Sequence, residues 1–92
     1  MSESVTDNVS KSRFEFGENA ASGFIDYRRS GTTLFLNHAE VPAALSGHGV
    51  GTRMVKEALD LIRRRGERMV PVCPFVEAVV RRNPAYADLR AE

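Results

Sequence analysis

The chain has 92 residues, of which 42% are hydrophobic and 27% are charged, and its formal net charge is +1. This length allows one small domain, and the near-neutral charge argues against nonspecific nucleic-acid binding as the main activity. The single cysteine excludes an internal disulfide, and no apolar run approaches the roughly 18–20 residues of a membrane-spanning helix.

Polar residues fill the N-terminal stretch 1–12, which we expect to be a disordered tail ahead of a single domain at residues 13–92. The domain opens with three segments rich in alternating or β-branched apolar residues, the pattern of half-buried strands. The pair Ser30-Gly31 between the second and third segments indicates a tight turn. These segments predict a three-stranded antiparallel meander of residues 13–16, 22–29 and 32–41.

The second half of the chain predicts a long helix, a strand and a short helix. Apolar residues recur every three to four positions from 50 to 65, which indicates an amphipathic helix, and Gly66 is a suitable stop. Residues 69–73 form a short apolar run typical of a buried strand, and a short helix is expected between Pro74 and Asn83. A strand reached through a helix should run parallel to the third strand, which gives a compact α+β fold.

Three alternating glycines, in the run Gly47-His48-Gly49-Val50-Gly51, stand between the third strand and the long helix. Without Cβ atoms the backbone can approach a ligand closely, and the helix start adds unpaired N–H groups and the positive end of its dipole. This turn suits a pyrophosphate, although a plain strand-to-helix connection is the alternative. Two familiar fingerprints fail on spacing, because Thr52 stands where a P-loop needs its second glycine and Met54 where a dinucleotide fingerprint needs its third.

Four segments in this order resemble the small single-domain branch of the GNAT-type N-acetyltransferase superfamily: NHAEVP at 37–42, GHGVG at 47–51, VCPFV at 72–76 and RRNPAY at 81–86. The resemblance covers about residues 13–90. In the superfamily the glycine loop reads Arg/Gln-x-x-Gly-x-Gly/Ala and binds the pyrophosphate of coenzyme A (CoA). Here Ser46 or a neighbour stands in place of the first Arg or Gln, so the resemblance implies a cradle made by backbone N–H groups.

The resemblance also implies how acetyl-CoA is held. The two parallel strands splay apart, and the pantetheine arm enters the gap like an added strand and pairs with free backbone groups. Larger relatives build an acceptor pocket from further helices and strands, for which this chain is too short, so its acceptor site is shallow or completed by a partner. The cofactor-binding residues implied are Val41, Gly47, His48, Gly49, Val50, Gly51, Thr52 and Cys73.

Glu40, near the end of the third strand, is the first candidate for the base that deprotonates an amine acceptor. A carboxylate beside an apolar cleft has a raised pKa, which suits proton abstraction, whereas the alternative is an outward-facing surface glutamate. His38 has the same strand parity, so its side chain should face the same side of the sheet. It is a candidate base, directly or through water, or else a structural histidine.

Two further side chains, those of Cys73 and Tyr86, are candidates for a catalytic role, and each has a structural role as the alternative. Cys73 is expected at the mouth of the cleft, as a nucleophile that accepts the acetyl group, as a cofactor-lining residue or as a buried apolar group. Tyr86, in a weakly structured C-terminal tail, is a candidate proton donor to the departing thiolate, or it packs on the core. A metal site is not expected, because the cysteine, His38 and His48 lack ligand spacing.

The sequence therefore predicts an acetyl-CoA-dependent transferase that acetylates an amine of unknown identity. The alternative is a non-catalytic module that binds CoA or adapts a larger complex. The arginine clusters at 63–68 and 81–82 complement helix dipoles or meet ligand phosphates, and a nucleic-acid-associated protein is a third, weaker interpretation. We expect a cytoplasmic monomer or weak dimer that binds neither nucleic acid nor membrane.

Overall fold

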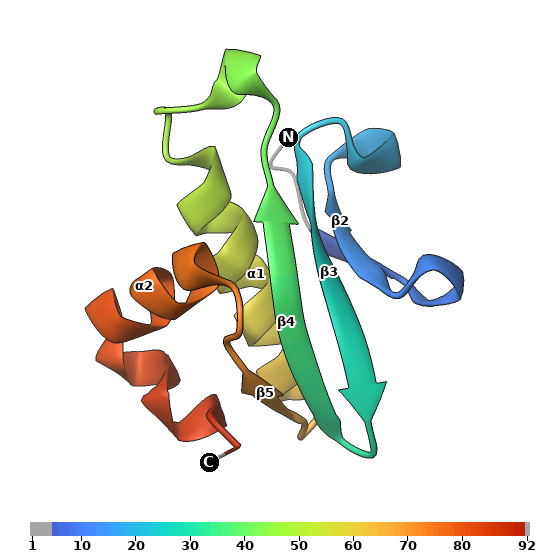
Figure 1. Ribbon diagram of the computed structural model, residues 1–92, viewed down its shortest axis with the longest axis vertical. Helices are drawn as coiled ribbons and strands as arrows, with labels where there is room; N and C mark the ends of the chain where they lie inside the picture. Colours follow the sequence, from blue (N-terminus) through green and yellow to red (C-terminus); the bar gives the residue numbers. More distant parts are fainter. Residues whose placement is uncertain (1–4, 92) are drawn as a thin grey trace.

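The computed structural model describes residues 5–91, within which five strands form one sheet in the order β1-β2-β3-β4-β5. Neighbouring strands are antiparallel except for β4 and β5, which are parallel (Figure 1). The strands are β1 (Val5–Asn8), β2 (Arg13–Phe16), β3 (Gly23–Ser30), β4 (Thr33–Glu40) and β5 (Arg68–Val70). The α-helices are α1 (Val50–Arg64) and α2 (Pro74–Arg82), and short 3-10 helices lie at Val9–Lys11, Glu18–Ala20, Ala43–Leu45 and Pro84–Leu89.

The core lies between α1 and one face of the sheet (Figure 1). Alternate strand residues point into it, and the apolar stripe of α1 packs against them, because a period of two and a period of 3.6 each gather apolar side chains on one face. Each large apolar side chain buried in this way contributes about 1.5–3 kcal/mol. The buried apolar strand residues are Phe14, Phe16, Ile25, Tyr27, Leu34, Leu36 and Met69, and those of α1 are Val50, Met54, Val55, Ala58, Leu59 and Ile62. The α+β fold, the long helix and the parallel fourth strand are thus confirmed.

The strand β1 corrects the prediction of a disordered tail, because Val5–Asn8 pairs antiparallel with β2 along its whole length. The antiparallel part of the sheet therefore has one strand more than the predicted meander, and residues 1–4 of the predicted tail lie outside the described residues. Polar contacts hold the strand, which is why apolar periodicity did not indicate it. The Tyr27 hydroxyl donates to an oxygen of Asp7 at 2.7 Å, and an Arg65 Nη1 donates to the other oxygen at 2.7 Å.

We expect Asp7→Ala to lower the free energy of unfolding by about 1–3 kcal/mol, the range for removing a partner from a buried polar group. The Asp7 side chain is only 3% exposed, and its loss leaves the Tyr27 hydroxyl without an acceptor on the N-terminal strand. Urea titration followed by circular dichroism measures the change. Thr6→Ala, at an exposed position of the same strand, is the control, and equal midpoints for Asp7→Ala and wild type would refute this role.

The parallel strands β4 and β5 pair over only three residues each, Thr33–Phe35 against Arg68–Val70. The chain then turns at Pro71, which has no N–H to continue the ladder, and the last contact with β4 is the Cys73 N–H donating to the Leu36 carbonyl at 2.9 Å. Beyond this point, β4 continues through a bulge at Asn37 and pairs with β3 alone among the described strands. The predicted splaying of the two strands is therefore present, and β5 is shorter than the run 69–73 from which it was predicted.

The C-terminal segment is more ordered than a weakly structured tail. Residues Pro84–Leu89 form a 3-10 helix, and Leu89 is buried in the core. The Ala91 N–H donates to the Met69 carbonyl at 2.9 Å, which adds a parallel bridge beside β5. This bridge fixes the segment that follows α2 against the sheet.

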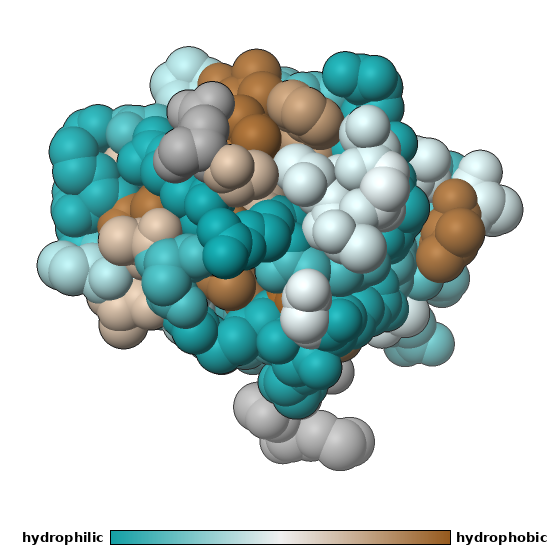
Figure 2. All heavy atoms as spheres, turned by 90° about the horizontal axis from the view of Figure 1, so that it is seen from below, coloured by the Kyte–Doolittle hydropathy of each residue, from teal (hydrophilic) through white to brown (hydrophobic). Residues whose placement is uncertain are grey.

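The surface carries few large apolar side chains. Seen from below, the molecule is mostly hydrophilic and its apolar residues lie in separate patches (Figure 2). Within residues 5–91 the exposed large apolar side chains are Val9, Val72 and Phe75. No helix in that range is long and apolar enough to cross a lipid bilayer. Phe75 is of interest because it borders the cavity described next.

Candidate functional site

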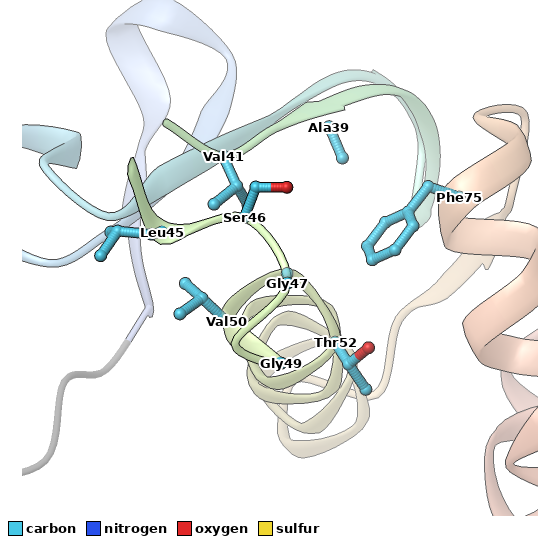
Figure 3. Close-up of a pocket in the computed structure, with 10 residues that line it drawn as sticks. Ala39, Val41, Leu45, Ser46, Gly47, Gly49, Val50, Thr52 and Phe75 are labelled. Atoms are coloured by element: carbon cyan, nitrogen blue, oxygen red, sulfur yellow. The ribbon is translucent and has the colours of Figure 1, made fainter. Parts of the chain in front are cut away.

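A cavity of about 520 Å³ lies where the end of β4, the glycine loop and the first turns of α1 and α2 meet. One wall consists of the loop and the helix start: Ser46, Gly47, Gly49, Gly51 and Thr52. The rest is apolar: Ala39, Val41, Leu45, Val50 and Phe75. In the close-up, Val41 and Ala39 lie on one side of this space, the first turn of α1 on another, and Phe75 points in from α2 (Figure 3). The splayed strands therefore open onto a space with one polar and one apolar side.

Gly47 and Gly49 have φ angles of 85° and 74°, in the left-handed region that favours glycine. A Cβ atom at either position would meet no heavy atom within 4 Å, so it is the backbone angle and not crowding that favours glycine there. Gly49 is also the N-cap of α1, and neither a side-chain cap nor an acidic residue occupies the first turn. The first N–H groups of the helix and its dipole are thus available to an anion such as a pyrophosphate.

Gly51 serves a different purpose from the other two glycines. It does not have a positive φ, but a Cβ atom there would lie 2.9 Å from Cζ and 3.1 Å from Cε2 of Phe75. Such separations are shorter than van der Waals contact, so a side chain at 51 and the ring at 75 cannot both keep their places. Gly51 lines the cavity, and the absence of a side chain there also leaves room for the aromatic ring of Phe75.

Phe75 lines the cavity together with Ala39 and Leu45, and the sequence analysis singled out none of these three as a site residue. The buried stripe of α2 consists of Val76, Val79 and Val80, whereas Phe75 is 41% exposed. Its position one residue ahead of a stripe spaced three and four apart is a signal that the ring points elsewhere. The ring is thus accessible from the cavity that it borders.

His38 and Glu40 lie together on the face of β4 opposite to Ala39. The His38 Nε2 and Glu40 Oε1 atoms are 3.0 Å apart, and their side chains are 56% and 61% exposed. Both are next to Ala39 in the chain, yet neither lines the cavity. The pair therefore occupies the solvent-facing side of the strand whose inner side borders the cavity.

The structure places Cys73 at the point where β4 and β5 separate, but not in the cavity wall. Cys73 is 6% exposed. Its N–H donates to the Leu36 carbonyl, and its own carbonyl accepts the Glu77 N–H at 2.9 Å. These contacts make Cys73 the residue that ends the strand pairing and caps α2. No hydrogen bond within residues 5–91 joins its thiol to His38 or Glu40, so the structure does not assemble a cysteine–histidine pair.

Tyr86 lies in a separate hollow between α1 and the C-terminal segment, so the structure does not bring it to the cavity. Its hydroxyl donates to an Asp60 oxygen at 2.9 Å, and burial together with this bond raises the pKa of Tyr86. A raised pKa makes the phenol a weaker acid, which further reduces its use as a proton donor. His48 is exposed and does not line the cavity either.

Comparisons with known proteins identify relatives of the chain. A family model described as GCN5-related N-acetyltransferase matches residues 13–89. The chain is also similar to a solution NMR structure from Staphylococcus aureus, of a protein proposed to be a GCN5-like N-acetyltransferase. The two chains are 22% identical with a TM-score of 0.71, and the similarity covers 94% of this chain and 85% of that one, which supports the fold. No curated protein matches the chain.

Proposed function

This chain belongs to the GCN5-related N-acetyltransferase family, and we propose that it transfers the acetyl group of acetyl-CoA to a primary amine. The observation that carries the proposal is the cavity between the splayed end of β4 and the uncapped start of α1. Its polar wall suits the pyrophosphate of CoA, and its apolar wall suits the aliphatic pantetheine arm. Gly47, Gly49, Gly51, Thr52 and Val50 form the wall on the helix side, and Ala39, Val41 and Phe75 the opposite one.

The open edge of β4 supports the same ligand. From His38 to Glu40 the strand pairs with β3, while β5 has already turned away at Pro71. Backbone groups on that edge are free to pair with the amides of an extended ligand, as an added strand would pair. We assign the edge beside Ala39 and Val41 to the pantetheine arm, and the end of β4 to the thioester.

Acetyl-CoA supplies an activated thioester when it is bound. The transfer joins the amine nitrogen to the carbonyl carbon and breaks the C–S bond, so the amine loses a proton and the thiolate takes one up. We assign the proton from the amine to Glu40, which is held by His38 through the 3.0 Å bond between Oε1 and Nε2. The two side chains flank Ala39 in sequence but lie on the other face of β4 from the cavity, so we infer that the amine reaches the thioester from the end of β4, where both faces of the strand are accessible.

Direct transfer is favoured over an acetyl-cysteine intermediate, because Cys73 is buried and its thiol is not bonded to a base within the described chain. We expect Cys73→Ala to keep at least a third of the wild-type rate of acetyl transfer, the loss of a small buried group being a packing effect of about 1 kcal/mol or less. Rapid-quench and steady-state assays measure this. A loss of turnover with an unchanged affinity for CoA would establish the covalent route instead.

A CoA-binding module without catalytic activity is the second candidate function. More than half of the His38 and Glu40 side chains is exposed, which favours this candidate, because an exposed base is not positioned by the protein next to one amine acceptor. Radiolabelled acetyl-CoA incubated with a panel of amines, polyamines and lysine peptides separates the two. Transfer of label to an amine supports the enzyme, and CoA binding with no transfer to any acceptor supports the module.

A further inference from the structure

A second hollow, also of about 520 Å³, lies next to the cavity along the seam between α1 and α2. Its walls come from the middle of α1 and from the end of α2 with the segment that follows. The residues that matter here are Lys56, Asp60 and Arg63 on one side and Arg82 and Tyr86 on the other.

The two hollows follow one another along the same two helices. Thr52, in the cavity wall, and Lys56, in the wall of the second hollow, are one turn apart on α1. That spacing puts them on one face of the helix, about 6 Å apart along its axis. On α2, Phe75 lines the cavity and Arg82 lines the second hollow, about two turns further along the helix. A ligand that leaves the cavity along this seam therefore reaches Lys56 and Arg82 next.

The cations of the second hollow differ in whether they are bonded to other side chains of the described residues. Arg63 is engaged, since it donates to Asp88 at 2.8 Å and to the Ala85 carbonyl at 2.6 Å, and the Asp60 carboxylate accepts the Tyr86 hydroxyl. By contrast, neither Lys56 nor Arg82 has a hydrogen bond or ion pair with any residue from 5 to 91, although Lys56 is only partly exposed. Two free cations facing a shared hollow attract an anion that carries more than one negative charge.

We propose that Lys56 and Arg82 bind the 3′-phosphate of the adenosine end of CoA. This inference rests on the proposed function, because it takes the pyrophosphate to lie at the start of α1. The ribose of CoA separates its pyrophosphate from a phosphate monoester, and a monoester carries a charge of about −1.5 to −2 at neutral pH. The spacing from Thr52 to Lys56 allows one ribose to span the two anion-binding sites, the pyrophosphate site at the start of α1 and the phosphate site at Lys56 and Arg82. The hollow thereby distinguishes CoA from thioesters and nucleotides that lack the 3′-phosphate.

The test compares the affinities of CoA and dephospho-CoA, measured by isothermal titration calorimetry at low salt. Charge-assisted contacts to a phosphate predict that the wild-type protein binds CoA about tenfold more tightly than dephospho-CoA. In the variant with Lys56→Ala and Arg82→Ala, the two affinities should become equal, because CoA binding weakens while dephospho-CoA binding stays. The wild-type preference should also shrink as salt is raised, since these contacts are near the surface.

The matched control removes two positive charges elsewhere, by Lys11→Ala and Arg64→Ala, which line neither hollow. The control should keep the wild-type preference for CoA. Equal wild-type affinities for CoA and dephospho-CoA, or a preference that survives the loss of Lys56 and Arg82, would overturn this inference and leave the proposed function standing. Failure of both ligands to bind the wild-type protein would overturn the proposed function together with the inference.

Discussion

Gly51→Ala should weaken CoA binding at least tenfold in a protein that still folds. The new Cβ would lie 2.9 Å from Cζ of Phe75 and 3.4 Å from Cγ2 of Val41, so the ring must turn away. It has room to do so, because Phe75 is 41% exposed and its ring is the free end of the side chain. Turning takes the ring out of its place in the cavity wall. Alanine also favours a helix over glycine by about 1 kcal/mol, so folding should not suffer.

Removing the ring provides the decisive comparison for this prediction. Without the ring there is nothing for the alanine at position 51 to clash with. Phe75→Ala should therefore reduce the affinity for CoA less in the Gly51→Ala variant than in the wild type. Calorimetry with CoA measures all four proteins. Gly31→Ala, in the remote turn between β3 and β4, is the control, since a φ of 64° makes it costly for stability without touching the cavity. Additive losses at 51 and 75 would show that the two residues do not interact.

Glu40→Gln should lower kcat for acetyl transfer about a hundredfold and leave the affinity for CoA unchanged. General-base catalysis by a positioned side chain contributes about 10²–10⁴-fold, and glutamine keeps the shape of the side chain without its proton affinity. His38→Gln should have a smaller effect, because His38 holds Glu40 through a single bond at 3.0 Å. Steady-state kinetics with the accepted amine and calorimetry with CoA check the two parts separately.

Glu18→Gln, at an exposed position in the short 3-10 helix Glu18–Ala20, is the matched control for the loss of one carboxylate. It should leave both kcat and CoA affinity at the wild-type level. A Glu40→Gln variant that turns over as fast as the control would place the base elsewhere. A variant that loses CoA affinity in the same proportion as kcat would assign Glu40 to ligand binding rather than to proton transfer.

Periodicity in the sequence predicts those parts of the fold that are held by apolar side chains. Phe14 and Phe16 alternate with polar residues and form β2, and the stripe from Met54 to Ile62 forms the inner face of α1. Periodicity did not predict strand β1, because the strand is held by the buried carboxylate of Asp7. That carboxylate contacts one tyrosine and two arginines that are distant in the sequence. A polar strand of this kind is visible only when the partners of its side chains are known.

In the candidate site, too, the local sequence predicts some features, whereas others depend on contacts between residues that are distant in the sequence. The glycine loop before α1 is a local feature, so the sequence predicts it, and the alternate spacing of His38 and Glu40 places them on one face. The close approach of the Phe75 ring to Gly51 joins residues from two helices and follows from the packing of α1 against α2. Likewise, only the folded chain shows that Tyr86 contacts Asp60 rather than the cavity.

The central claim is that the start of α1 binds the pyrophosphate of CoA, and an NMR titration of the ¹⁵N-labelled protein with CoA tests it most directly. The account predicts that the amide signals of residues 47–52 move as CoA is added and saturate with it, while the signal of Gly31, in the remote turn, stays in place. Unchanged signals at residues 47–52 with CoA at millimolar concentration would contradict it.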